Sequence, residues 1–133
     1  LTHAFPAPER IAAASIADLA GVGMPAKRAE ALRHLAHAVV KRAVDFSDTP
    51  AGLCASLQAL PGIGAWTAQY IAMRALRDPD ALPAGDLILR QRLGGEKPSS
   101  ARAVEQRAET WRPWRAYGLI HLWAQASEEK SRN

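Results

Sequence analysis

Cysteine is nearly missing from this chain of 133 residues, which contains one, Cys54. A single thiol excludes an internal disulfide and any zinc or iron–sulfur site built from four cysteines. Long apolar runs are also missing, since no stretch approaches the roughly twenty residues that span a bilayer. No signal-peptide pattern is present either. We therefore expect a cytoplasmic protein that has no membrane partner.

Strands are missing as well, because no segment alternates apolar and polar residues, whereas helical periodicity recurs throughout. The sequence predicts an all-α fold, a compact helical bundle with one core. We assign residues 1–127 to this domain and residues 128–133 to a charged, frayed tail. The first residue is Leu1, which we interpret as the start of a trimmed or partial sequence. The net charge of +4 favours an acidic partner.

Proline, glycine and capping residues divide the chain into short helices. Ser15 and Asp18 have the spacing of a capping box. Thr49 and Pro50 are typical of an N-cap followed by a first-turn proline. The expected helices cover residues 8–14, 15–21, 25–44, 49–58, 67–77, 86–93, 99–111 and 113–127.

A glycine turn at residues 60–64 is the centre of the pattern. Gly62 and Gly64 flank the apolar Ile63, and glycine adopts backbone angles that other residues avoid. The helix that follows begins around Thr67, so the unpaired N–H groups at its start form an anion site. In a basic protein the anion is a nucleic-acid phosphate. An ordinary helical corner is the alternative, because short glycine motifs have many false positives.

Trp66 and Tyr70 are four residues apart and share one face of this helix, away from its apolar stripe. They either form a pocket wall or pack against a second surface. Trp123 lies on the last expected helix. Trp111 and Trp114 are interpreted as residues that fix the junction between the last two helices.

Asp86 follows a Pro- and Gly-containing loop and opens a short helix. Aspartate is a favoured N-cap, so a purely structural role is one interpretation. Capping is compatible with chemistry, because the helix dipole and the free N–H groups stabilise the negative charge. A positioned carboxylate suits a reaction that passes through a positively charged sugar.

These residues resemble a known pattern. A hairpin at 60–64, a helix and a loop ending in Asp86 are similar to the helix-hairpin-helix, Gly/Pro-rich loop, aspartate motif of the DNA glycosylase superfamily. Within it the chain resembles the C-terminal half of the 3-methyladenine DNA glycosylase II family of bacteria. The resemblance covers residues 5–123, and the family's upstream region lies outside this sequence. The similar motifs are residues 23–25 with 27–32, residues 61–70, residues 111–117 and residues 121–123.

The resemblance implies a DNA repair enzyme that hydrolyses the N-glycosidic bond of alkylated purines in double-stranded DNA. It implies that Asp86 is catalytic and that Trp66, Tyr70 and Trp123 line the base pocket. It further implies a monomer in the bacterial cytoplasm, at the nucleoid, with no required cofactor. The backbone carbonyls of Gln58, Leu60 and Ile63 are expected to hold a structural Na⁺ or K⁺. The hairpin residues expected to bind DNA are Gly62, Ile63, Gly64, Ala65 and Thr67.

The expected activity is monofunctional. Strand-cleaving relatives carry a lysine two residues after the second hairpin glycine, and here that residue is Trp66, which has no amine nucleophile. Two alternatives stay open on the sequence. One is a non-catalytic helix-hairpin-helix fragment that only binds DNA, and the other is a glycosylase for oxidised or mismatched bases.

Overall fold

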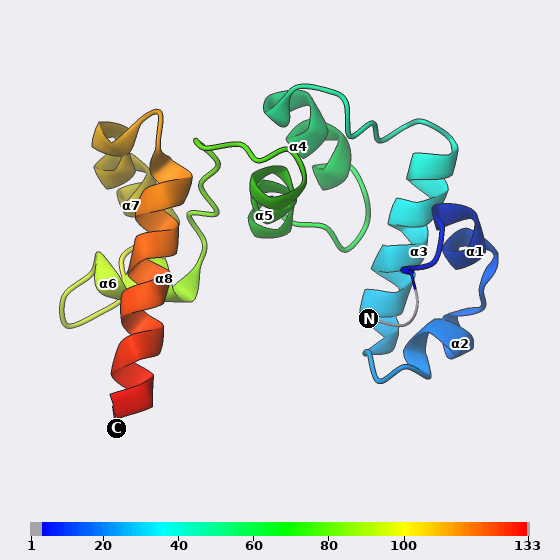
Figure 1. The fold of residues 1–133 in the computed structure, drawn as a ribbon, viewed down its shortest axis with the longest axis horizontal. Coiled ribbons are helices and arrows are strands. Elements are labelled where there is room, and N and C mark those ends of the chain that lie inside the picture. The colour runs from blue at the N-terminus through cyan, green and yellow to red at the C-terminus, as the bar shows by residue number, and fades with distance from the viewer. Residues whose placement is uncertain (1–3, 133) are drawn as a thin grey trace. The chain divides into compact units, whose positions relative to one another are not determined.

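The computed structural model describes residues 4–132, and this part of the chain is helical without any strand, so the all-α prediction is confirmed (Figure 1). The chain forms two compact units that meet in sequence between Gly64 and Ala65. The division into residues 1–127 and a tail stays a prediction. The helices are α1 Pro8–Ala13, α2 Ile16–Ala20, α3 Ala26–Val40, α4 Pro50–Gln58, α5 Ala65–Ala75, α6 Leu87–Arg92, α7 Ala101–Ala108 and α8 Arg115–Arg132, with a 3-10 turn at Glu109–Trp111.

In the first unit, α1 and α2 pack against α3 (Figure 1). The predicted capping box starts α2: the Ser15 hydroxyl accepts a bond from the Asp18 N–H at 3.0 Å, and the Asp18 carboxylate accepts the Ser15 N–H at 3.3 Å. The predicted cap of α4 is also present, since the Thr49 hydroxyl accepts the Gly52 N–H at 3.1 Å. Each such cap contributes about 1 kcal/mol to helix stability.

The helix predicted over residues 25–44 ends early, at Val40. Lys41 is its C-cap, and Arg42 has a φ of 55°, in the left-handed region. The N–H groups of Ala43 and Val44 both donate to the Ala38 carbonyl, so the chain turns back on the helix end. This turn buries Val44, the last residue of the predicted helix.

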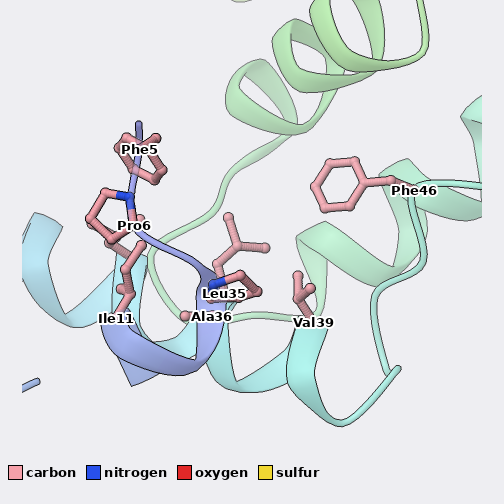
Figure 2. A pocket seen from close by; sticks show the side chains of 9 residues that line it. Phe5, Pro6, Ile11, Leu35, Ala36, Val39 and Phe46 are labelled. Carbon is pink, nitrogen blue, oxygen red and sulfur yellow. The ribbon is translucent and has the colours of Figure 1, made fainter. Parts of the chain in front are cut away.

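An apolar hollow of about 300 Å³ lies in the same unit. Figure 2 shows Phe5 and Pro6 at one end of it and Phe46 at the other, with Leu35 and Val39 between them. Its remaining lining residues are Pro8, Ile11, Leu32 and Ala36. No polar side chain reaches into this hollow from the residues that line it, so it carries none of the chemistry predicted for the chain.

The second unit has a continuous apolar core to which α5, α6, α7, α8 and the α5–α6 loop all contribute. Tyr70 and Trp123 pack against the edge of that core. Trp111 closes it at the junction before α8, where a Cβ on Gly118 would lie 2.9 Å from the Trp111 ring. The buried core residues are Met73, Ala81, Leu82, Ala84, Leu89, Val104, Ala108, Ala116 and Leu119.

Helix α8 continues through Arg132, whereas the sequence predicted its end near Ser127. Glu129 accepts two hydrogen bonds from the Arg92 guanidinium, at 2.9 and 2.5 Å, and this contact ties the end of α8 to α6. The same contact lowers the pKa of the Glu129 carboxyl and raises the pKa of Arg92. The residues interpreted as a frayed tail are therefore helical as far as Arg132.

Candidate active site

The loop between α5 and α6 carries Asp86 to its position. Helix α5 ends at Ala75, and Arg77 turns the chain with a φ of 57°. The loop is buried along residues 81–84 although it has no regular secondary structure. Its last turn is closed by the Asp86 N–H, which donates to the Pro83 carbonyl at 2.9 Å. A buried, bonded loop presents Asp86 at a defined point of the second unit.

Asp86 is the N-cap of α6, as the structural interpretation predicted. Its Oδ1 accepts the Leu89 N–H at 3.0 Å. The carboxylate has two further donors, however. Trp123 donates its indole N–H to Oδ1 at 3.0 Å, and Trp66 donates its indole N–H to Oδ2 at 3.2 Å. Capping and a contact with both tryptophans therefore occur together in one side chain.

The three aromatic rings predicted for the base pocket form one cluster around this carboxylate. Trp66 and Tyr70 are stacked, with ring centroids 5.2 Å apart and planes 8° from parallel. Tyr70 and Trp123 are tilted by 46° at a centroid distance of 6.1 Å. Trp66 is 40% exposed, although large apolar side chains are usually covered. The structure thus brings Asp86 together with Trp66, Tyr70 and Trp123.

This arrangement has a defined electrostatic character. An ionised carboxylate offers about four acceptor positions, and three N–H groups occupy three of them here. Hydrogen bonds to a charged group contribute about 1.5–3 kcal/mol each, so the carboxylate is held in place strongly. A fixed negative charge beside electron-rich ring faces can stabilise a cationic group that lies against them.

Of the two tryptophans predicted to fix the junction before the last helix, only Trp111 packs there. Trp111 packs against the core of the second unit. Trp114 is 58% exposed and meets Tyr117 edge to face, with ring centroids 5.7 Å apart. Packing of the partly buried Trp111 therefore fixes the junction, whereas Trp114 lies on the surface.

Four polar side chains near the Asp86 loop were missed by the sequence reasoning. One of them, Asp80, belongs to the loop, and the other three bond to the loop across gaps of 13 to 35 residues, which no local spacing reveals. Their one signal is a pair of arginines beside two tryptophans in the stretch 111–115, and that stretch was interpreted through its tryptophans alone. The residues are Gln69, Asp80, Arg112 and Arg115.

The glycine turn lies in the first unit up to Gly64. Gly62 has a φ of +86°, and a Cβ built on it would lie 2.7 Å from the Cβ of Ala31, so both conformation and packing require glycine. Gly64 has neither constraint, because nothing lies within 4 Å of an added Cβ. Ile63 is buried, and its N–H donates to the Leu60 carbonyl at 3.2 Å.

Helix α5 begins at Ala65, two residues before its predicted start, so Ala65 and Thr67 both lie in its first turn. The first N–H groups of a helix have no partner within the helix. These donors are therefore the ones that the sequence analysis assigned to a phosphate. Their binding of DNA stays a prediction.

The carbonyls expected to hold a monovalent cation come from α4 and the turn after it. Gln58 is the last residue of α4, and the Leu60 carbonyl accepts one hydrogen bond, from Ile63. A carbonyl oxygen has two lone pairs, and the bond from Ile63 uses one of them. The cation site stays a prediction. Within residues 4–132 no group of three or more His, Cys, Asp or Glu side chains could hold a metal ion.

None of the helices in the described part of the chain has the length and apolarity needed to cross a membrane.

Comparisons with known proteins show that this chain is similar to DNA glycosylases. A DNA-3-methyladenine glycosylase 2 of Escherichia coli (strain K12) is 42% identical over 122 residues, which cover 90% of this chain. A DNA-3-methyladenine glycosylase of Bacillus subtilis (strain 168) is 33% identical, again over 90% of this chain. Both relatives are DNA-3-methyladenine glycosylases. The chain spans 42% of the length of each of them. No protein-family model matches the chain.

A solved structure is similar as well. The 3-methyladenine DNA glycosylase Mag1 of Schizosaccharomyces pombe, in complex with abasic DNA, has a TM-score of 0.81 and 25% identity to this chain. The match covers 92% of this chain and 64% of that one. The predicted resemblance to 3-methyladenine DNA glycosylases is therefore confirmed.

Proposed function

We propose that this chain carries the catalytic part of a DNA glycosylase that removes alkylated purines of the 3-methyladenine type from double-stranded DNA. The observation that supports it most is the Asp86 carboxylate, which accepts indole N–H bonds from two tryptophans of the predicted base pocket. The similarity to DNA-3-methyladenine glycosylases supports the same reaction.

The pocket suits a cationic base. Alkylation at a ring nitrogen gives the purine a positive charge, which makes it a good leaving group. Flipping the nucleotide out of the duplex costs a few kcal/mol. Stacking on Trp66, Tyr70 and Trp123 offsets this cost, because each cation–π contact contributes about 0.5–2 kcal/mol.

Asp86 acts as a fixed negative charge beside the sugar. Its Oδ1 already accepts two N–H bonds and its Oδ2 accepts one, so a single acceptor position remains on Oδ2. Charge develops on the sugar as the glycosidic bond breaks, and a preorganised carboxylate stabilises that charge without reorganising. We infer that this electrostatic role dominates over activation of the attacking water.

The glycine turn binds the DNA backbone. Backbone N–H groups at a turn and helix start contact phosphates without reading the base sequence. The open space around Gly64 allows a phosphate to approach the backbone closely. We also infer that the protein acts as a monomer on bacterial DNA in the cytoplasm, at the nucleoid.

A Na⁺ or K⁺ held by the carbonyls of Gln58, Leu60 and Ile63 would add a positive charge for the phosphate. Tetramethylammonium is too large for such a site. Affinity for duplex DNA should therefore fall when it replaces K⁺ at equal ionic strength. Equal affinity in the two salts would remove the cation from the proposal.

Release of free base from a panel of damaged duplexes tests the function. The full-length protein that contains this chain should release base from methylated DNA and leave duplexes with oxidised or mismatched bases intact. Release from the oxidised or mismatched duplexes alone would establish the other enzyme class. Tight DNA binding without any release would identify a binding module.

A further inference from the structure

The loop that precedes Asp86 is bonded on both sides to the helices that supply the indoles. On the α8 side, the Ala116 N–H donates to the Pro79 carbonyl at 2.9 Å. On the α5 side, Gln69 Oε1 accepts the Leu82 N–H at 3.0 Å. Trp66 belongs to α5 and Trp123 to α8. Helices α5 and α8 therefore bind the loop and also carry the two indole N–H groups that donate to Asp86.

Asp80 is the centre of the contact with the start of α8. Arg115 Nε donates to the Asp80 backbone carbonyl at 3.0 Å and to its Oδ1 at 2.8 Å. Arg112 bonds to the other carboxylate oxygen, Oδ2. The side chains of Arg115 and Asp80 are only 15% and 22% exposed. The contact is thus a shielded ion pair that fixes backbone as well as side chain.

Glu109 holds the two arginines from the other side. It accepts hydrogen bonds from Arg112 at 2.8 and 3.2 Å and lies 3.5 Å from Arg115. Planar guanidinium groups keep their donors in a fixed fork, which gives such a network geometric precision. The arginines therefore face Asp80 in one orientation.

We propose that Asp80 and Gln69 are positioning residues, which fix the loop so that the Asp86 carboxylate reaches the indole N–H groups of both Trp66 and Trp123. The expected effect on base release rests on the proposed function, whereas the effect on the position of Asp86 does not. Neither residue touches the base or the sugar. Both act through the loop.

Regular structure cannot supply this precision, because residues 76–85 form neither helix nor strand. Few backbone bonds lie within the loop, and apolar burial of residues 81–84 is non-directional. The directional bonds come from Gln69 on α5, from Arg115 and Ala116 on α8, and from Arg112 just before α8. A misplacement of 1 Å at a catalytic group costs on the order of 100-fold in rate.

Gln69 offers a matched pair of variants. Gln69→Leu removes the oxygen that accepts the Leu82 N–H, whereas Gln69→Glu keeps an oxygen at the same reach. We expect Gln69→Leu to lower the single-turnover rate of base release roughly 10- to 100-fold and to leave the Kd for damaged duplex nearly unchanged. Gln69→Glu should restore most of the rate. Asp80→Asn, which loses the charge facing both arginines, should behave like Gln69→Leu.

Glu129→Gln is the control, because it breaks an Arg–carboxylate contact of the same unit outside the loop. It should change neither the rate nor the Kd. Circular dichroism and the Tm identify any variant that fails to fold. Equal rate losses in Glu129→Gln and in the loop variants would mean that general destabilisation is the cause, and would overturn the proposal.

A second readout does not depend on catalysis. The chain has four tryptophans, so it gives four indole N–H signals in a nitrogen-15 NMR spectrum. Gln69→Leu and Asp80→Asn should shift the signals of Trp66 and Trp123 and leave that of the exposed Trp114 in place. Unshifted signals overturn the positioning role. A wild-type protein that releases no base contradicts the proposed function alone.

Discussion

Each tryptophan at Asp86 offers two different groups to the site. Its ring contacts the flipped base in the proposed reaction, and its indole N–H holds the carboxylate. Phenylalanine keeps the first property and lacks the second. The two contributions can therefore be separated by one substitution, which an alanine variant would not do.

Trp123→Phe is predicted to impair catalysis more than binding. Loss of one hydrogen bond to a charged group is worth about 1.5–3 kcal/mol, or on the order of 10- to 100-fold in rate. The Kd for damaged duplex should change less, since the ring remains. Single-turnover base release and fluorescence anisotropy measure the two quantities. Trp114→Phe, on the exposed start of the junction, is the control and should match the wild type.

The two glycines of the turn should respond differently to alanine. Gly64→Ala should leave the Tm unchanged, because an added Cβ meets nothing within 4 Å, yet it should weaken binding to every DNA sequence alike. Gly62→Ala should lower stability by at least about 1–2 kcal/mol, the typical cost of a side chain in the left-handed region. Urea unfolding and anisotropy report these effects. Intact DNA affinity in a folded Gly64→Ala protein would show that another surface binds the phosphates.

Helices and loops were predictable from the sequence where local signals determine them. The caps at Ser15 and Thr49, the loop before Asp86 and the all-α class all follow from spacing and capping chemistry. The early end of α3 could not be predicted in this way, because a turn after the helix, and not the helix itself, buries Val44. The length of α8 could not be predicted either, because its last turns are held by the hydrogen bonds between Glu129 and Arg92 on α6.

The same reasoning applies to the candidate site. Helical spacing predicted that Trp66 and Tyr70 share a face, and their stacked rings agree with it. The hydrogen bonds of Asp86 with both indoles, and of Asp80 with Arg115 at the start of α8, are tertiary contacts over long sequence separations. Such contacts leave no periodic pattern in the sequence. The roles of these residues in catalysis stay predictions.

Acid should weaken the ion pairs at the C-terminal ends of α7 and α8. The hydrogen bonds from Arg112 lower the pKa of Glu109, and those from Arg92 lower the pKa of Glu129. A carboxyl whose pKa is lower in the folded state contributes stability above its ordinary value, here 4.5, and this contribution is lost as the pH falls through the folded pKa. The urea midpoint should therefore decrease below about pH 4.5.

Replacing both glutamates by glutamine provides the control for this pH dependence. The Glu109→Gln, Glu129→Gln protein should be less stable near neutral pH and should lose less stability on acidification. An unchanged dependence would assign the acid sensitivity to other carboxylates, such as Asp45, whose pKa is lowered by hydrogen bonds from Ser47.

For the molecule as a whole, the proposed reaction ends at an abasic site with an uncut strand. Strand cleavage through a Schiff base needs an amine nucleophile, and Trp66 stands where strand-cleaving relatives have lysine. Borohydride should therefore trap no protein–DNA adduct, and intact abasic strand should accumulate on a denaturing gel. A trapped adduct that survives blocking of the N-terminal amine, together with a nicked strand, would mean that another lysine reaches the site.

The catalytic role of Asp86 is tested most directly by the single-turnover rate of 3-methyladenine release by Asp86→Asn in the full-length protein that contains this chain. Asparagine keeps an oxygen for the Leu89 N–H and caps well, so the fold and Tm should be retained. Loss of the negative charge should lower the rate by at least about 100- to 1,000-fold, as expected for a preorganised electrostatic group. A folded Asp86→Asn protein that releases base at a rate near that of the wild type would contradict the catalytic role of Asp86.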